Sequence, residues 1–251
     1  MRTPALVAAV GIPAYLLFMV LAAPASFLAA RAARESDGRL HFSDTQGSLW
    51  SGSARAHVDA PGGAYTFDRV EWRLLPGKLA EGRIAFDVAV DSGEARGNVQ
   101  LLRGWSDWEA RGATARIRSR LLPVFFPMVA AWRPEGKVSI TADGVRWNER
   151  EIHGNATVEW LDADVALSDV KPLGAYRLAL RGMGDTAGIV LSTLSGPLEI
   201  KGAGQWKLPT GVAFSGEARA EGSSAAALEP LLNLFGPKRP DGARAIEVRI
   251  R

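Results

Sequence analysis

Apolar and polar residues alternate with a period of two along most of the chain beyond residue 39. The segments 84–90, 138–141, 176–181 and 246–251 are clear examples. Successive side chains of a β-strand point to opposite faces of a sheet, so this alternation is typical of antiparallel strands with one buried and one solvated face. Glycines supply turns between such segments. The pattern predicts a mostly β protein built of antiparallel meander sheets.

Two apolar segments interrupted by prolines are the best candidates for helix. In the first, residues 116–131, Pro123 and Pro127 limit any helix to a short piece. The second, residues 223–237, starts with serines that can cap a helix and ends at Gly236-Pro237. Each segment is predicted to be a short helical lid over the end of a sheet.

A Gly-x-x-Trp pattern occurs twice and indicates an internal duplication. Each copy is followed by a second tryptophan and then by a turn with proline and glycine. Because repeated units usually bury their apolar faces against a copy, we predict two diverged β repeats, 35–135 and 136–251, which together form one domain. The candidate structural positions of the repeats are Gly47, Trp50, Trp72, Gly144, Trp147, Trp160, Pro172, Gly174 and Tyr176.

The tryptophans allow two interpretations. Large aromatic residues at equivalent positions of a repeat usually pack in a core or pair across strands. A binding groove lined with indoles is the sharper alternative. The first interpretation is favoured, which leaves the nine positions with a structural role.

The N-terminal segment is predicted to be a transmembrane anchor over residues 1–34. Residues 4–30 contain no charged side chain, which is long enough to span a bilayer. A cleaved signal peptide is the alternative, since residues 22–26 offer small residues for cleavage. The apolar stretch continues to Ala30, which favours a retained single-pass anchor. The exported character of the β domain then suggests that the bulk of the chain lies in the periplasm.

Charge and motif content argue against nucleic-acid binding and against catalysis. The formal net charge is +3, and the charged residues are interspersed without a basic stripe, so no nucleic-acid partner is expected. The chain has no cysteine and no histidine spacing typical of a metal site. Ser168-Asp-Val-Lys171 lacks the companion motifs of an acylation site. We therefore expect no enzyme activity and no cofactor.

Short glycine pairs are also weak candidates for a nucleotide loop. Gly182-Met-Gly184 and Gly202-Ala-Gly204 lie between β segments, with no helix to present its N-terminus to a phosphate. They are expected to be turn or bulge glycines.

The order of the aromatic motifs resembles the type II secretion system protein N family. The resemblance rests on the apolar N-terminal segment, on Gly47-Ser-Leu-Trp50-Ser-Gly52, and on the segments 72–76, 160–176 and 202–206. It implies an accessory inner-membrane protein with a periplasmic domain, in the machine that exports folded proteins across the outer membrane. The implied partners are subunits of the inner-membrane platform or the secretin. The resemblance implies no catalytic or metal-binding residue.

The alternating strands also allow a function of a different class. Long strands from a duplicated unit could curl into an open trough whose apolar face binds or bridges lipids in the periplasm. In that case part of the apolar pattern would line a groove, and a lipid would be the partner.

Overall fold

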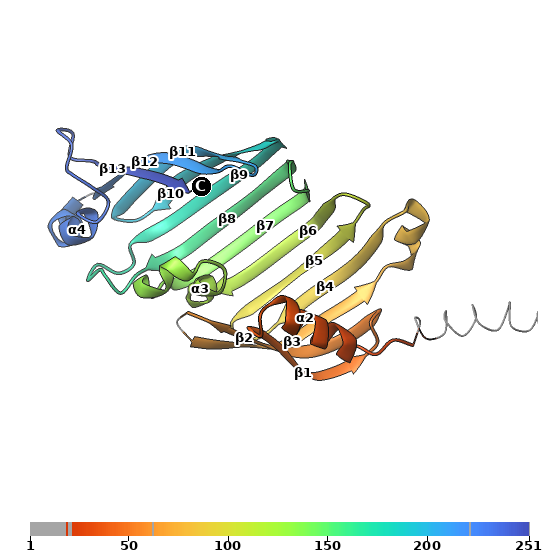
Figure 1. The fold of residues 1–251 in the computed structure, drawn as a ribbon. Helices are drawn as coiled ribbons and strands as arrows, with labels where there is room; N and C mark the ends of the chain where they lie inside the picture. The colour runs from red at the N-terminus through yellow and green to blue at the C-terminus, as the bar shows by residue number, and fades with distance from the viewer. Residues whose placement is uncertain (1–18, 20–21, 62, 221, 251) are drawn as a thin grey trace, which may run out of the picture.

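The computed structural model describes residues 19, 22–61, 63–220 and 222–250. In this part of the chain, thirteen strands form one antiparallel sheet in which every strand pairs with the next one in sequence (Figure 1). The mostly β, antiparallel prediction is confirmed. The strands are β1 (Leu40–Gly47), β2 (Ser51–Ala60), β3 (Gly63–Leu74), β4 (Ile84–Asp91), β5 (Ala95–Arg103), β6 (Trp108–Arg118), β7 (Glu135–Trp147), β8 (Ile152–Asp164), β9 (Gly174–Gly184), β10 (Thr186–Ser195), β11 (Leu198–Lys207), β12 (Gly211–Ala220) and β13 (Arg244–Ile250).

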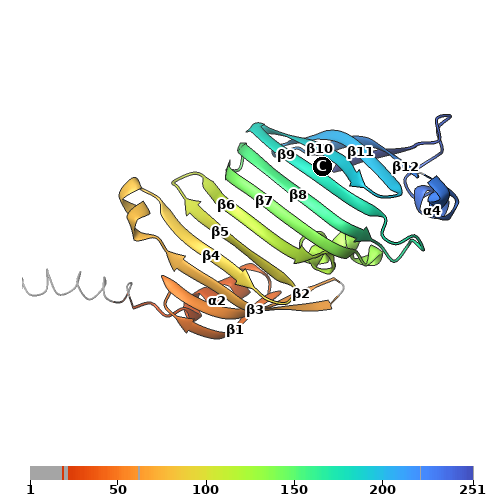
Figure 2. The same cartoon turned by 180° about the vertical axis from the view of Figure 1, so that it is seen from behind.

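Helices are short and lie where chain connections leave the sheet. Both segments predicted as lids contain helix, one between β6 and β7 and the other between β12 and β13. Seen from behind, the strands form an uninterrupted outer surface, while α2 and the lid between β6 and β7 lie on the far side (Figure 2). The helical elements are α2 (Ser26–Glu35), η1 (Pro76–Glu81), η2 (Ser119–Leu121), α3 (Leu122–Phe125), η3 (Pro127–Trp132), η4 (Gly222–Ser224) and α4 (Ala225–Leu232).

Strand register puts one apolar or glycine residue of each strand into a single row from β2 to β13. Directly paired residues project to the same face of a sheet, so the whole row faces one way. Twelve strands at the usual spacing make this row roughly 50 Å long. Its members are Ala54, Val70, Val90, Gly97, Ala115, Ile140, Val158, Leu178, Leu191, Gly202, Gly216 and Ile246.

From β3 to β10, the neighbouring row, one residue away along each strand, is entirely polar. This contrast is the structural origin of the period-two pattern and defines an apolar inner face and a polar outer face. A one-residue slip would exchange the two faces, so the alternation fixes the register. The polar row contains Arg69, Asp91, Arg96, Arg116, Ser139, Glu159, Arg177 and Ser192.

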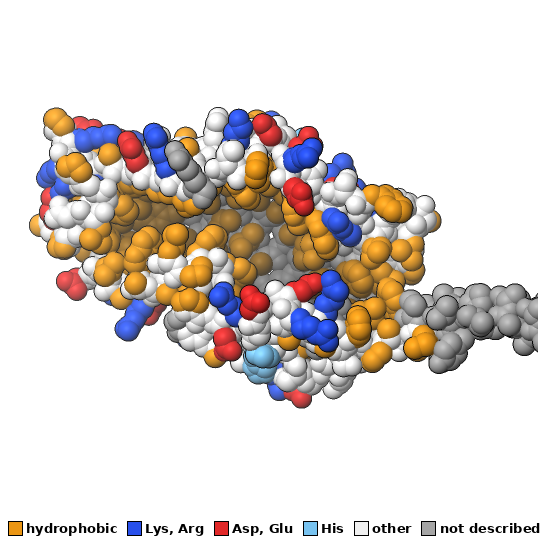
Figure 3. All heavy atoms as spheres, viewed as in Figure 1, with side chains coloured by type: hydrophobic (Ala, Val, Ile, Leu, Met, Phe, Trp, Pro, Cys, Tyr) orange, Lys and Arg blue, Asp and Glu red, His pale blue; other side chains and the backbone are white. Residues whose placement is uncertain are grey.

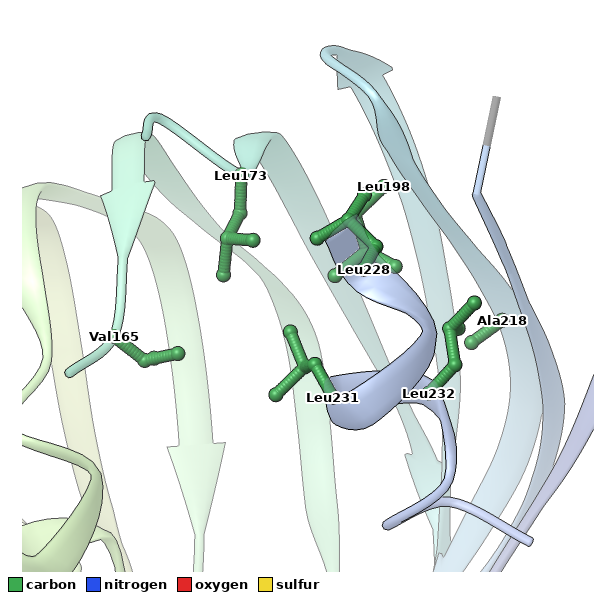
Figure 4. Close-up of a cluster of buried hydrophobic side chains, with 7 residues drawn as sticks. All are labelled: Val165, Leu173, Leu198, Ala218, Leu228, Leu231 and Leu232. Carbon is green, nitrogen blue, oxygen red and sulfur yellow. The ribbon is translucent and has the colours of Figure 1, made fainter. Parts of the chain in front are cut away.

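A cluster of buried hydrophobic side chains lies where α4 packs on the inner face of β11 and β12 (Figure 4). Leu228, Leu231 and Leu232 of α4 point toward the sheet, and Leu228 has no exposed surface. Arg244 at the start of β13 also holds α4, since its Nη2 donates to Glu229 Oε1 at 2.6 Å. The other buried members of this cluster are Val165, Leu173, Leu198 and Ala218.

The predicted anchor lies mostly outside the described residues. Its last part does not continue as one apolar helix, because Pro24 forms a β-bridge with Ser48 and a new helix, α2, starts at Ser26. Among the described residues, none of the helices has both the length and the apolar character needed to cross a membrane.

The two predicted halves belong to one continuous sheet. The predicted boundary after residue 135 falls at the start of β7, which pairs with β6 from Arg118↔Lys137 to Trp108↔Trp147. The two lids follow β6 and β12, which are six strands apart. The duplication itself stays a prediction.

Candidate functional site

The inner face of the sheet is hollowed into an open apolar trough. Hydrophobic side chains line the hollow, while charged side chains lie around its rims (Figure 3). We define the trough as the inner-face side chains of β3 to β13. Ile140, Val158 and Leu178 lie in the middle of its floor. Their side chains are apolar, yet each is only half-buried. The trough is therefore a groove with an accessible apolar lining.

Exposure differs between the two ends of the trough. We call one end the lid end, where the connections from β2 to β3, β6 to β7 and β12 to β13 lie, and the other the turn end, where β1 joins β2 and β5 joins β6. At the lid end the inner face is buried, as at Ala95, Val138, Tyr176, Leu198 and Ala218. At the turn end it is exposed, as at Ile84, Trp108, Trp206, Val248 and Ile250.

The lid between β6 and β7 closes part of the trough. Phe125 of α3 lies over a cavity of about 310 Å³ whose walls are almost entirely apolar. The walls come from inner-face residues of β3 to β7, among them Phe67, Val90, Ala115, Ile117 and Ile140. Such a space suits a hydrocarbon chain better than a polar ligand, since its lining offers few hydrogen-bonding groups.

Tyr176 and Trp160 fasten the lid end on the side of α4. The Tyr176 hydroxyl donates to the Leu198 carbonyl at 2.9 Å, which ties β9 to β11. Burial raises the pKa of Tyr176, so this hydroxyl stays protonated and available as a donor. The Trp160 ring lies 6.3 Å from the Tyr176 ring, and its Nε1 donates to the Glu135 carbonyl at 2.9 Å.

At the turn end, a cation and two indoles form an exposed ladder across β5, β6 and β7. The Arg103 guanidinium lies 4.9 Å from the Trp108 ring centroid, and Trp108 stacks on Trp147 at 6.5 Å with an interplanar angle of 16°. Cation–π and stacked pairs keep these side chains ordered beside solvent. This end therefore presents an amphipathic aromatic surface.

The first group of predicted positions lies at the turn end, around the connection from β1 to β2. Gly47 has φ +86° and ends β1, where a side chain would meet the backbone of Ser51. Trp50 is half-buried in this connection. Trp72 is half-buried on the inner face of β3, and its Nε1 donates to the Ser48 carbonyl at 3.2 Å. These residues fix the corner of the sheet at which the chain enters.

The remaining predicted positions are divided between the two ends. Gly144 (φ +63°) accommodates a β-bulge shortly before Trp147, at the turn end. Trp160, Pro172, Gly174 and Tyr176 lie at the lid end, and Gly174 is packed against the Ser195 carbonyl so closely that a Cβ there would come within 2.5 Å. The structure thus puts Trp72 and Trp160, the proposed equivalents, at opposite ends of the trough. Trp72, Trp147 and Trp160 are half-buried. The choice between core packing and a binding groove stays a prediction.

One polar cluster, absent from the sequence predictions, lies on the outer face near the turn end. Glu109 is 5% exposed, and its carboxylate accepts from Arg111 at 2.6 and 3.1 Å and from Arg83. Arg83 also donates to Asp107 at 2.7 Å. The hydrogen bonds from Arg111 and Arg83 hold the pKa of Glu109 below its ordinary value, against the opposing effect of burial. Each cation faces a carboxylate, so the cluster is a structural ion-pair network.

The described residues contain no group of three metal-ligating side chains, and the trough lining has few polar groups. The candidate site is thus the accessible apolar inner face of a single meander sheet with two helical lids. The matched family is the type II secretion system protein N family, whose model covers residues 38–247. The chain belongs to this family, which makes it a component of the type II secretion system that works with other parts of that system. No curated protein matches the chain, and no solved structure does.

Proposed function

We propose that the chain is an accessory structural component of the type II secretion system, held by one N-terminal span in the inner membrane with its β domain in the periplasm. The match to the family over most of the β domain carries this proposal. The uncharged segment 4–23 supports the anchor, since about 20 apolar residues suffice to cross a bilayer. Contacts with platform or secretin subunits would use the sheet edges at β1 and β13 or the lids, by strand addition or apolar docking.

Cross-linking in native membranes tests this role. Because the chain lacks cysteine, Met128→Cys at the 72% exposed lid position introduces a unique thiol. We expect a membrane-impermeant maleimide to label it in intact spheroplasts, and a thiol cross-linker to join it to secretion-platform or secretin subunits. Labelling only after the membrane is broken would contradict the periplasmic location. Recovery of no secretion subunit from gently solubilised membranes would contradict the role in the secretion machine.

A second candidate function is binding of the acyl chains of a lipid in the trough. The observation that favours it is the accessible apolar row from Val70 to Ile246, which an ordinary sheet would bury under another layer. An acyl chain gains about 0.8 kcal/mol for each methylene moved out of water. A groove of roughly 50 Å offers room for such burial along its whole floor. This function and an assembly role are compatible, since they use different surfaces.

Filling the trough should reduce lipid binding. Ala142 is a half-buried, small residue of the inner face, so Ala142→Phe adds a ring to the groove without needing space in a sealed core. We expect native mass spectrometry to detect less co-purifying lipid with this variant. The matched control is Thr141→Phe, one residue away on the exposed outer face. Equal lipid occupancy in the two variants, or no lipid with the unchanged chain, would exclude the trough as a lipid site.

A further inference from the structure

We propose that the turn end of the sheet rests on the surface of a lipid bilayer, so that the exposed end of the trough opens at the membrane interface. This inference uses the anchor of the proposed function to bring the membrane near. It adds a contact that the anchor alone does not provide.

The first observation is the set of apolar side chains at the turn end. Trp105, in the connection between β5 and β6, is 94% exposed and has no role in a core. Other exposed apolar residues come from the connections or strand ends on either side of it. They are Leu79 (50%), Ile84 (47%), Trp108 (41%), Met183 (55%) and Trp206 (36%). Tryptophan is enriched at membrane–water interfaces because its ring is apolar and its N–H is polar.

The second observation is the point at which the N-terminal segment reaches the sheet. The Leu49 N–H donates to the Ala23 carbonyl at 2.8 Å, and the Ala25 N–H to the Gly47 carbonyl at 3.3 Å. Both bonds lie at the connection from β1 to β2, which belongs to the turn end. The uncharged segment 4–23 therefore ends, at Ala23, against this end of the sheet. A bilayer crossed by that segment must lie close to the turn end.

The lid end has exposed apolar residues as well, and the entry point of the chain distinguishes the two surfaces. Phe125, Phe126 and Met128 are 58–72% exposed, but they lie at the other end of the strands. Strands such as β7, with 13 residues, hold these ends roughly 40 Å apart at the usual rise of 3.2–3.4 Å per residue. One membrane beside Ala23 cannot touch both ends of an upright sheet. The membrane contact is therefore assigned to the turn end.

Docking at the turn end also accounts for the difference in exposure between the two ends of the trough. The inner face is buried beneath α4 at the lid end and exposed at Ile84, Trp108 and Trp206. With this end at the interface, the exposed inner-face residues are covered by the bilayer. Acyl chains then have a continuous apolar path from the bilayer into the groove.

Fluorescence quenching in reconstituted vesicles tests the contact with the full-length chain. Single cysteines are introduced by Trp105→Cys, by Leu79→Cys as a second position at the turn end, and by Met128→Cys as a control at the lid end whose exposure lies between the two. Each is labelled with an environment-sensitive fluorophore. The vesicles contain phosphatidylethanolamine and phosphatidylglycerol, with or without bromine on the acyl chains. We expect labels at 105 and 79 to shift to the blue and to be quenched by brominated lipid, and the label at 128 to keep its intensity.

Alkaline extraction of the same vesicles separates this proposal from the anchor. If the chain resists extraction but the labels at 105 and 79 are not quenched, the anchor holds and docking is overturned. If the label at 128 is quenched as strongly as the others, docking by the turn end is also overturned. If the labels at 105 and 79 alone are quenched while alkali extracts the chain, docking stands and the anchor fails.

Discussion

Replacing Leu228 with alanine should lower the free energy of unfolding by about 2–5 kcal/mol, the range for truncating a fully buried leucine. Leu228 has no exposed surface and packs with Leu198 and Ala218 of the sheet, in the cluster that α4 completes. Leu231 and Leu232 pack in the same cluster, so a cavity at its centre weakens the hold of α4 on the inner face. Denaturant unfolding followed by circular dichroism measures the change.

The matched control is Leu234→Ala, in the same connection. Leu234 is 68% exposed, so its truncation should change the free energy of unfolding by less than about 0.5 kcal/mol. Protease sensitivity of the lid segment gives an independent measure, and only Leu228→Ala should raise it. Equal effects of the two substitutions would mean that α4 does not pack on the sheet as described.

The strands could be predicted well from the sequence because the same alternation of apolar and polar residues recurs from strand to strand. The alternation over residues 84–90 corresponds to β4, and residues 138–141 lie within β7. In both, the large apolar side chains face the trough, and Asp87, Ser139 and Thr141 project to the outer face. A period of two arises when one face of a strand is buried and the other is exposed. The presence of a strand and the face to which each side chain points can therefore be predicted from it directly.

The lid segments were located correctly, whereas their detailed ends were not. Pro123 and Pro127 break the first into α3 and the neighbouring 3₁₀ turns, as their fixed backbone requires. The second forms α4 from Ala225. Ser224 occupies the N-cap position without a side-chain capping hydrogen bond, and α4 is held by its buried leucines and by Arg244.

The glycine pair at 202 and 204 illustrates what a single sequence cannot reveal. It was expected in a turn or bulge, yet both residues lie inside β11, in regular register with β12. The Phe214 ring occupies the space above Gly202, where a Cβ would come within 2.5 Å of it. Glycine is needed here for the close approach of an aromatic ring across strands. Only the register between strands discloses that partner.

The sequence also could not predict that the apolar face of the sheet is open. An apolar face that lines a trough and one that is sealed by a second layer give the same alternation. The lipid alternative was therefore stated as a possibility without residues that would decide it. The difference lies in tertiary coverage, which here is limited to the lids at one end.

Removing the carboxylate of Glu109 should cost about 3 kcal/mol of unfolding free energy, at the lower limit for breaking a buried ion pair. Glu109→Ala leaves Arg83 and Arg111 without their shared acceptor in a site where the carboxylate is 5% exposed. The lower limit applies because Arg83 keeps its bond to Asp107. The control Asp91→Ala removes a carboxylate that is 61% exposed and paired with Arg96, and should change the free energy by less than about 0.5 kcal/mol.

The same network predicts a dependence on pH with a definite sign. Arg111 first, and then Arg83, lower the pKa of Glu109 in the folded chain, whereas the unfolded chain has the ordinary value of about 4.3. The folded state therefore binds protons less readily, and the stabilisation is complete above the ordinary pKa. It is lost as the pH falls from there through the lowered pKa. Unfolding free energies of the unchanged chain and of Glu109→Gln, measured from neutral to acidic pH, should converge as the pH drops. A difference that stays constant down to the lowest pH would contradict the role of this carboxylate.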